Sequence, residues 1–92
     1  MQERHSDRER YFDEQARTTE KYYIPYIRKC CPELPQEVLE VGCGEGGNLF
    51  SFAQLGCSVT GVDIAAGRIA EARKFFAERG AKVLLSHPTF SN

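Results

Sequence analysis

Apolar positions recur at two different spacings along the chain, and the change falls near residues 32–36. In the first part, four side chains follow the i, i+3, i+4, i+7 spacing of an amphipathic helix: Tyr23, Tyr26, Ile27 and Cys30. Pro25 lies inside this pattern, so the helix either begins just before the proline or is kinked there. We therefore predict an N-terminal helical region over residues 1–35.

After residue 35, short apolar runs alternate with longer helical patterns. The apolar runs cover residues 37–42, 57–63 and 81–86, and the helical patterns cover residues 47–55 and 65–79. This order is βαβαβ. Strands that are separated by such helices must be parallel, with right-handed crossovers. The second part is therefore predicted to be an α/β fold with a parallel sheet of about three strands.

Composition and charge exclude several classes of function. Of the 92 residues, 41% are hydrophobic and 27% charged, and no apolar run is long enough to span a membrane. A net charge of −1 gives no electrostatic indication of nucleic-acid binding. The charged N-terminus lacks the apolar region of a secretory signal, so we expect a cytoplasmic protein. The four cysteines form no C-x-x-C pair, and with only two histidines we expect neither a metal site nor a disulfide framework.

The candidate site is the stretch VLEVGCGEGG at residues 38–47, where four glycines follow directly after the first predicted strand. Glycines at a strand-to-helix turn allow a tight turn and a close approach of ligand to backbone. The N–H groups at the start of the following helix favour anionic or polar ligand groups. We therefore expect a ligand at the carboxyl ends of the strands.

Two ligand classes fit these glycines. Gly42, Gly44 and Gly47 satisfy the dinucleotide fingerprint G-x-G-x-x-G, and Asp63 stands where an acid would bind ribose hydroxyls. Glu40, however, lies two residues before the first glycine, where its carboxylate would repel a pyrophosphate and favour a cation. A ligand that carries a ribose, an ammonium and a sulfonium but no phosphate fits both acids. A nicotinamide dinucleotide remains the less favoured alternative.

At these residues the chain resembles the class I S-adenosylmethionine-dependent methyltransferases, whose first motif is acid-x-Gly-x-Gly-x-Gly. The segment SVTGVDIAAGRIAEAR at residues 58–73 is similar to the second strand, ribose-binding acid and second helix of that family. The resemblance covers about residues 36–85 and implies S-adenosylmethionine as cofactor. It implies the following cofactor-binding residues: Glu40 near the methionine ammonium, Gly42, Cys43, Gly44 and Gly46 along the amino acid portion, Asp63 at the ribose hydroxyls, and Ile64 on the adenine.

The N-terminal region is similar to the helix that often covers the cofactor in this family. By this resemblance, Arg17 and Tyr22 are candidates for contact with the cofactor carboxylate or the methyl donor. The alternative is that they belong to a helix face packed on the sheet. No catalytic residue is assigned, and His87 has no paired Asp or Cys that would mark it as a base.

The chain departs from the family pattern in two places. After the third strand, the family usually carries a Gly-Asp or similar pair that contacts adenine, whereas Pro88 and Thr89 stand here. The family fold also has further strands, which supply most of its substrate-binding and catalytic groups. We therefore predict an incomplete Rossmann-like sheet over residues 36–92, the cofactor-binding half of a truncated methyltransferase that is inactive alone. Its methyl acceptor, most simply a small molecule, is not identified.

A second hypothesis is a non-catalytic binding or interaction module. In the strand order that the resemblance implies, the first strand is central, and its outer neighbour lies beyond the third strand of the chain. Residues 37–41 would then present an open edge of unpaired N–H and C=O groups. We expect this edge to pair with a second copy of the chain, giving a homo-oligomer. Alternatively, the N-terminal helices fold back and cover the edge.

Overall fold

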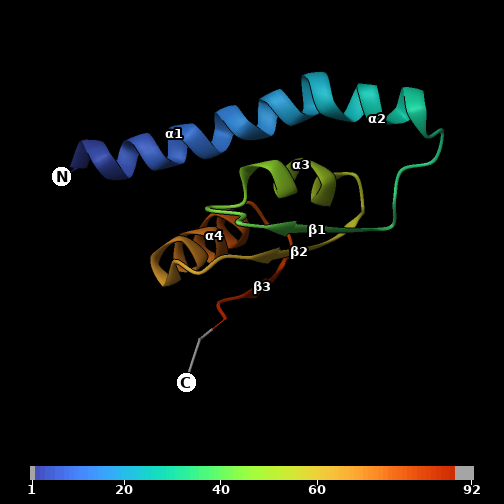
Figure 1. The fold of residues 1–92 in the computed structure, drawn as a ribbon. Coiled ribbons are helices and arrows are strands. Elements are labelled where there is room, and N and C mark those ends of the chain that lie inside the picture. The colour runs from blue at the N-terminus through green and yellow to red at the C-terminus, as the bar shows by residue number, and fades with distance from the viewer. Residues whose placement is uncertain (1, 89–92) are drawn as a thin grey trace.

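The computed structural model describes residues 2–88, with side chains described from residue 7 onward. The N-terminal part is helical, as predicted. It consists of α1 (Gln2–Thr18), the π-helical turn η1 (Thr19–Tyr23) and α2 (Ile24–Cys30). These three elements follow one another as one long rod that lies over α3, an element of the second part (Figure 1). In the described part of the chain, no helix has the length and apolar character that crossing a membrane requires.

The structure resolves the ambiguity at Pro25, which lies in the first turn of α2, directly after the π turn. The π turn is closed by the N–H of Ile24, which donates to the carbonyl of Thr19, five residues back. The predicted amphipathic face is only partly the inward face: Tyr23 and Tyr26 are 55% and 67% exposed and Cys30 is exposed, whereas Ile27 is half-buried and packs against the core. The side chains that face inward are Thr19 and Ile24, which are almost fully buried. After the wider turn, the inward face runs through Ile24 and Ile27, so it is displaced by about one position from a face that begins at Tyr23.

The second part has the predicted βαβαβ order. Its elements are β1 (Glu37–Val41), α3 (Gly47–Gln54), β2 (Ser58–Val62), α4 (Ala66–Glu78) and β3 (Leu84–Ser86). All strand pairs are parallel, and the sheet order is β1-β2-β3. Because both crossovers run in the same direction across the sheet, right-handed connections place α3 and α4 on the same face. The prediction of an incomplete Rossmann-like α/β sheet of three strands is confirmed.

The core lies between this sheet face and the helices, and α1 is part of it. Phe12 of α1 is 0% exposed, and its ring centroid lies 5.4 Å from that of Phe50 and 5.1 Å from that of Phe75. Tilted and edge-on rings at such distances attract each other beyond the area that they bury. The division into a helical region 1–35 and a domain 36–92 stays a prediction, but the two parts share this core.

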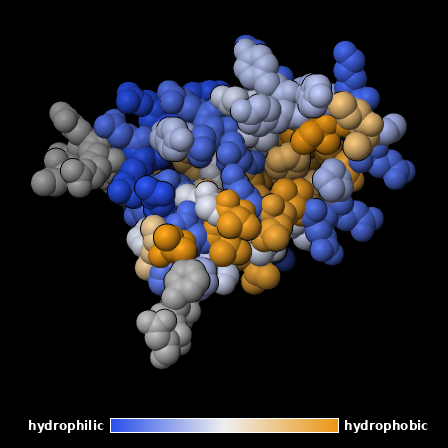
Figure 2. All heavy atoms as spheres, in the orientation of Figure 1, coloured by the Kyte–Doolittle hydropathy of each residue, from blue (hydrophilic) through white to orange (hydrophobic). Residues whose placement is uncertain are grey.

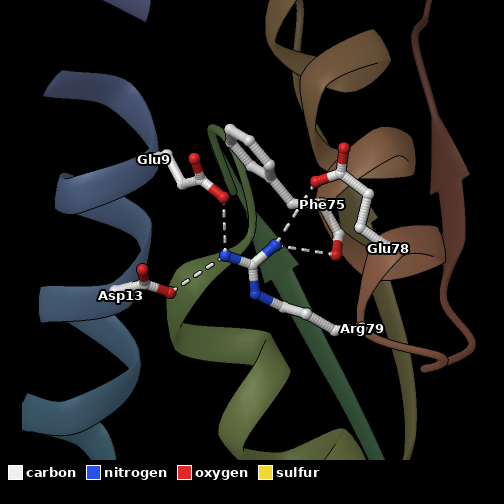
Figure 3. Close-up of polar contacts among 5 residues, drawn as sticks. All are labelled: Glu9, Asp13, Phe75, Glu78 and Arg79. Carbon is white, nitrogen blue, oxygen red and sulfur yellow. Dashed lines mark hydrogen bonds and ion pairs between the residues drawn. The ribbon is translucent and has the colours of Figure 1, made fainter. Parts of the chain in front are cut away.

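Arg79, at the end of α4, ties α1 to the domain a second time. Figure 3 shows its guanidinium between the carboxylates of Glu9 and Asp13, at 3.2 Å and 3.1 Å. The same guanidinium lies over the Phe12 ring, 4.7 Å from its centroid, where the ring quadrupole attracts a cation. Its Nη1 also donates to the carbonyl of Phe75. Helix α1 is therefore held against the rest of the fold by both core packing and ion pairs.

The opposite face of the sheet carries no helix within residues 2–88. Side chains alternate along β1, so that Val38 and Glu40 are half-buried while Leu39 and Val41 point outward, 64% and 78% exposed. Leu84 of β3 is 69% exposed as well. Figure 2 shows apolar surface where Figure 1 places the strands. In the described residues β1 is also an edge strand, as expected, because only β2 pairs with it.

Candidate functional site

The turn from β1 to α3 contains two kinds of glycine. Gly42 and Gly44 have positive φ angles of 75° and 59°, and an added Cβ at either would meet no atom within 4 Å. Gly46 and Gly47 are packing positions instead, because an added Cβ would come within 2.9 Å of the Phe76 ring or 2.6 Å of the Phe12 carbonyl oxygen. The first two glycines therefore present bare backbone to open space, and the other two allow α3 to pack against α4 and α1.

A cavity of about 330 Å³ opens above the first two glycines, between the loop and α1. Its walls combine residues from α1, β1, the loop and α4: Arg8, Tyr11, Gln15, Glu40, Gly42, Cys43, Gly44, Glu45 and Arg68. Both signs of charge line it. The cavity therefore suits a polar ligand that carries a positive and a negative group.

Glu40 is one of two acids, with Glu71, that have a buried carboxylate oxygen without a hydrogen-bond partner among the described residues. Its Oε2 accepts a hydrogen bond of 3.4 Å from the side-chain amide of Asn48, whereas its Oε1 is buried without a hydrogen-bond partner among the described residues. Burial raises the pKa of this carboxyl, and the Asn48 bond opposes that rise. A buried acceptor that lacks a partner costs about 1–3 kcal/mol. A cationic donor in the cavity would supply the missing partner.

Asp63 fastens the glycine loop to the end of β2. Its Oδ2 accepts the N–H of Gly44 and its Oδ1 accepts the N–H of Ala65, each at 2.8 Å. These two backbone hydrogen bonds are the main reason that the pKa of this 5%-exposed carboxyl is lowered. Each carboxylate oxygen has a second lone pair. Asp63 thus holds the loop in place and keeps acceptor capacity for a ligand hydroxyl.

The loop residues Cys43 and Glu45 are both buried. Burial, together with the nearby acids Asp63 and Glu40, raises the pKa of the Cys43 thiol to about 11. The thiol is therefore protonated near neutral pH and is a packing group, not a nucleophile. Glu45 forms an ion pair of 3.1 Å with Arg8, which joins α1 to the rim of the cavity.

The structure brings together most of the residues predicted from the sequence. Glu40, Gly42, Cys43 and Gly44 line the cavity, and Asp63 contacts the loop directly. Gly46 lies behind the loop, where it is buried against α4. Ile64 follows Asp63 and is 70% exposed, and its carbonyl lies 2.8 Å from Nε2 of His87.

Arg17 and Tyr22 are both exposed and are not among the residues that line the cavity. Sequence reasoning missed the residues of the same helical region that do line it, namely Arg8, Tyr11 and Gln15. Their spacing of i, i+3 and i+7 defines one face of a helix, beside the buried Phe12. That periodicity is the signal that could have found them.

Two further expectations concern the end of the chain and metals. Pro88, which stands where the family usually carries a pair that contacts adenine, is half-buried, and Thr89 lies outside the described residues. Among residues whose side chains are described, no group of three potential metal ligands is found.

Comparison with known proteins connects this geometry to one family. The family model described as a methyltransferase domain matches residues 38–91. Among curated proteins, the chain is 37% identical to aklanonic acid methyltransferase DauC of Streptomyces sp. strain C5, over 77% of this chain and 37% of DauC.

Solved structures show the same fold. The PH0226 protein of Pyrococcus horikoshii aligns with a TM-score of 0.67 and 28% identity, over 83% of this chain and 34% of that protein. An S-adenosylmethionine-dependent methyltransferase of Clostridium acetobutylicum aligns with a TM-score of 0.53 and 17% identity, over 79% of this chain and 37% of that one. At 17% identity the likeness concerns the fold alone. The chain thus spans about a third of the length of the proteins that it resembles.

Proposed function

The chain belongs to the methyltransferase domain family, and from this premise we propose that it binds S-adenosylmethionine in the cavity between α1 and the glycine loop. The observation that carries the proposal is Glu40, whose buried Oε1 lacks a partner within the described residues and whose carboxylate lines the cavity. The α-ammonium group of the cofactor would satisfy this oxygen. A phosphate at the same place would be repelled by it.

The remaining residues support the same ligand. The exposed backbone of Gly42 and Gly44 leaves room for the amino acid portion of the cofactor, and Arg8 and Arg68 on the cavity wall suit its carboxylate. Asp63 would accept the ribose hydroxyls, and the exposed Ile64 would contact the adenine. The position of Arg17 and Tyr22 makes them weaker candidates than Arg8 and Tyr11 of α1.

The proposed activity is methyl transfer to an acceptor, most simply a small molecule. When bound, the cofactor supplies an electrophilic methyl group on its sulfonium. This chain would bind the cofactor through Glu40 and Asp63 and fix its orientation, which is a large part of what such a transfer requires. No residue is assigned as a base, and Cys43 is excluded as one because of its raised pKa.

Replacing Glu40 with glutamine is expected to lower the affinity for S-adenosylhomocysteine about tenfold, because the side chain then loses its negative charge near the ligand ammonium. Glu37→Gln is the matched control, since Glu37 lies on the same strand but is exposed. Isothermal titration calorimetry measures both. Equal affinities of the Glu40→Gln variant and the wild type would contradict the assignment of this carboxylate.

We also propose that the chain self-associates through the free edge of β1. The N–H of Gly42 donates to the carbonyl of Val62 in β2. Since N–H groups alternate in direction along a strand, the N–H of Val41 points to the free edge. The outward side chains Leu39 and Val41 add apolar surface that a second copy would cover.

The expected result is a sedimentation coefficient that rises with concentration for the wild type and stays monomeric for Val41→Pro, which removes the edge N–H. Val41→Ala keeps that N–H and serves as the control. A folded wild type that remains monomeric at every concentration would show that this edge does not pair.

A further inference from the structure

We propose that Thr19 and Asn48 form a partly buried hydrogen-bond relay that orients Glu40 toward a cationic group of the ligand. The inference rests on the proposed function, because it concerns the same cavity. It assigns a positioning role to two residues that do not line the cavity and to the π turn that carries one of them.

The relay connects three elements of the fold. Thr19 of η1 is 0% exposed, and its hydroxyl donates to Oδ1 of Asn48 at 2.8 Å. Asn48, in the first turn of α3, donates in turn from Nδ2 to Oε2 of Glu40 at 3.4 Å. The N-terminal helical rod is thereby joined to the acid at the end of β1 by side chains alone.

The direction of these bonds gives the relay its effect. An ionised carboxylate can only accept, so the Nδ2 amide group of Asn48 faces Glu40 and its Oδ1 faces Thr19, whose hydroxyl donates to that oxygen. This donation stabilises the orientation in which the NH₂ faces the carboxylate, because without it Oδ1 would lose its hydrogen-bond partner. An N–H donor favours the ionised form of that carboxyl, whereas a carbonyl in its place would favour the protonated form. With Oε2 held by Asn48, Oε1 stays available to the ligand.

Thr19 follows the buried Phe12 by seven residues and therefore continues the inward face of α1, and the π turn that begins at Thr19 rotates the residues after it. Thr19 and Ile24 are five residues apart and both face the core. At about 3.6 residues per turn, two such positions would lie on different sides of an α-helix. The wider turn, closed by the Ile24 N–H on the Thr19 carbonyl, brings Ile24 to the side that Thr19 already faces. Single π turns inside α-helices are frequent at functional sites.

Charged groups around Glu40 determine how the relay can be detected. Burial raises the pKa of Glu40, and Asn48 lowers it. The other titratable and charged groups come from four sides: Arg8 and Tyr11 of α1, Cys43 and Glu45 of the loop, Asp63 after β2, and Arg68 of α4. Cys43 remains a neutral thiol below its pKa of about 11, and the lowered pKa of Asp63 keeps that acid ionised. Because the other acids are present in both proteins, the difference in the acidic limb of ligand binding between Thr19→Val and the wild type is expected to report Glu40.

The test compares two probes on the full chain. S-Adenosylhomocysteine carries the ammonium group, whereas 5′-methylthioadenosine has the same adenosine and thioether but no amino acid portion. Thr19→Val keeps the shape of the buried side chain. We expect it to lower the affinity for S-adenosylhomocysteine about three- to tenfold and to leave the affinity for 5′-methylthioadenosine unchanged. Thr19→Ser keeps the hydroxyl and should restore the wild-type affinity.

A pH profile provides the second readout. Binding of S-adenosylhomocysteine should fall as the pH drops through the pKa of Glu40, because the protonated carboxyl no longer attracts the ammonium. Without the oriented amide that pKa rises further, so the acidic limb of Thr19→Val should shift to higher pH. The relay would be overturned if Thr19→Val lowered the affinity for both probes equally. It would also be overturned if the variant changed neither the affinity for S-adenosylhomocysteine nor the acidic limb of its pH profile. A wild type that binds neither probe would overturn the proposed function itself.

Discussion

Truncation of Phe12 to alanine is expected to destabilise the fold by about 3–5 kcal/mol, the range for a fully buried aromatic side chain. The ring is 0% exposed and packs against Phe50, Phe75 and Phe76. It also lies under the guanidinium of Arg79, which would lose its aromatic partner. For a domain of this size such a loss is a large part of the total free energy of unfolding.

Chemical denaturation followed by circular dichroism measures this effect. Tyr26→Ala is the matched control, because Tyr26 is an aromatic residue of the same helical rod that is 67% exposed. We expect the control to change the free energy of unfolding by less than about 0.5 kcal/mol. If Phe12→Ala were as mild as the control, α1 would not be part of the core in solution.

Asp63→Ala is expected to weaken the affinity for S-adenosylhomocysteine about 10- to 100-fold, more than Glu40→Gln. Two effects combine. The ribose hydroxyls would lose their acceptor, and the N–H groups of Gly44 and Ala65 would lose theirs. The loop that presents bare backbone to the ligand would therefore lose its attachment to β2. Asp63→Asn keeps one acceptor oxygen and should fall between the alanine variant and the wild type.

The same variant has a predicted pH dependence of stability. The pKa of Asp63 is lowered in the folded state, so its contribution is present above the unfolded value of about 3.9 and is lost as the pH falls through the folded value. The difference in free energy of unfolding between wild type and Asp63→Ala should be largest near neutral pH and should shrink at strongly acidic pH. Unchanged affinity and a pH-independent difference would contradict the role of Asp63.

The sequence predicted the sheet well, because its signals are local. Alternating apolar runs and helical patterns after residue 35 determine βαβαβ, and a right-handed parallel arrangement follows from short crossovers. Glu40 and the glycines were located because their residue types are unusual at the end of a buried strand. Gly42 and Gly44 do face open space, as the expected ligand site requires.

The helical rod was predicted less accurately, for a physical reason. Five residues, Thr19–Tyr23, form a π turn, and this turn changes which side of the rod faces inward. The apolar spacing that begins at Tyr23 and Tyr26 does not mark the inward face, because both are exposed whereas Ile24 is buried. Tyr22 lies in this turn. The local sequence does not indicate which side of the rod Tyr22 or Arg17 faces, and both are exposed. Only the packing of Phe12 against α3 and α4 determines that Arg8, Tyr11 and Gln15 border the cavity.

We infer that this cavity binds a sulfonium cofactor of the S-adenosylmethionine type and not a nicotinamide dinucleotide. Isothermal titration calorimetry of the chain with S-adenosylhomocysteine and with NAD tests this inference directly. Because Glu40 repels phosphate and attracts ammonium, we expect saturable binding of S-adenosylhomocysteine and an affinity for NAD that is at least about tenfold weaker. NAD affinity equal to or tighter than that for S-adenosylhomocysteine would contradict it.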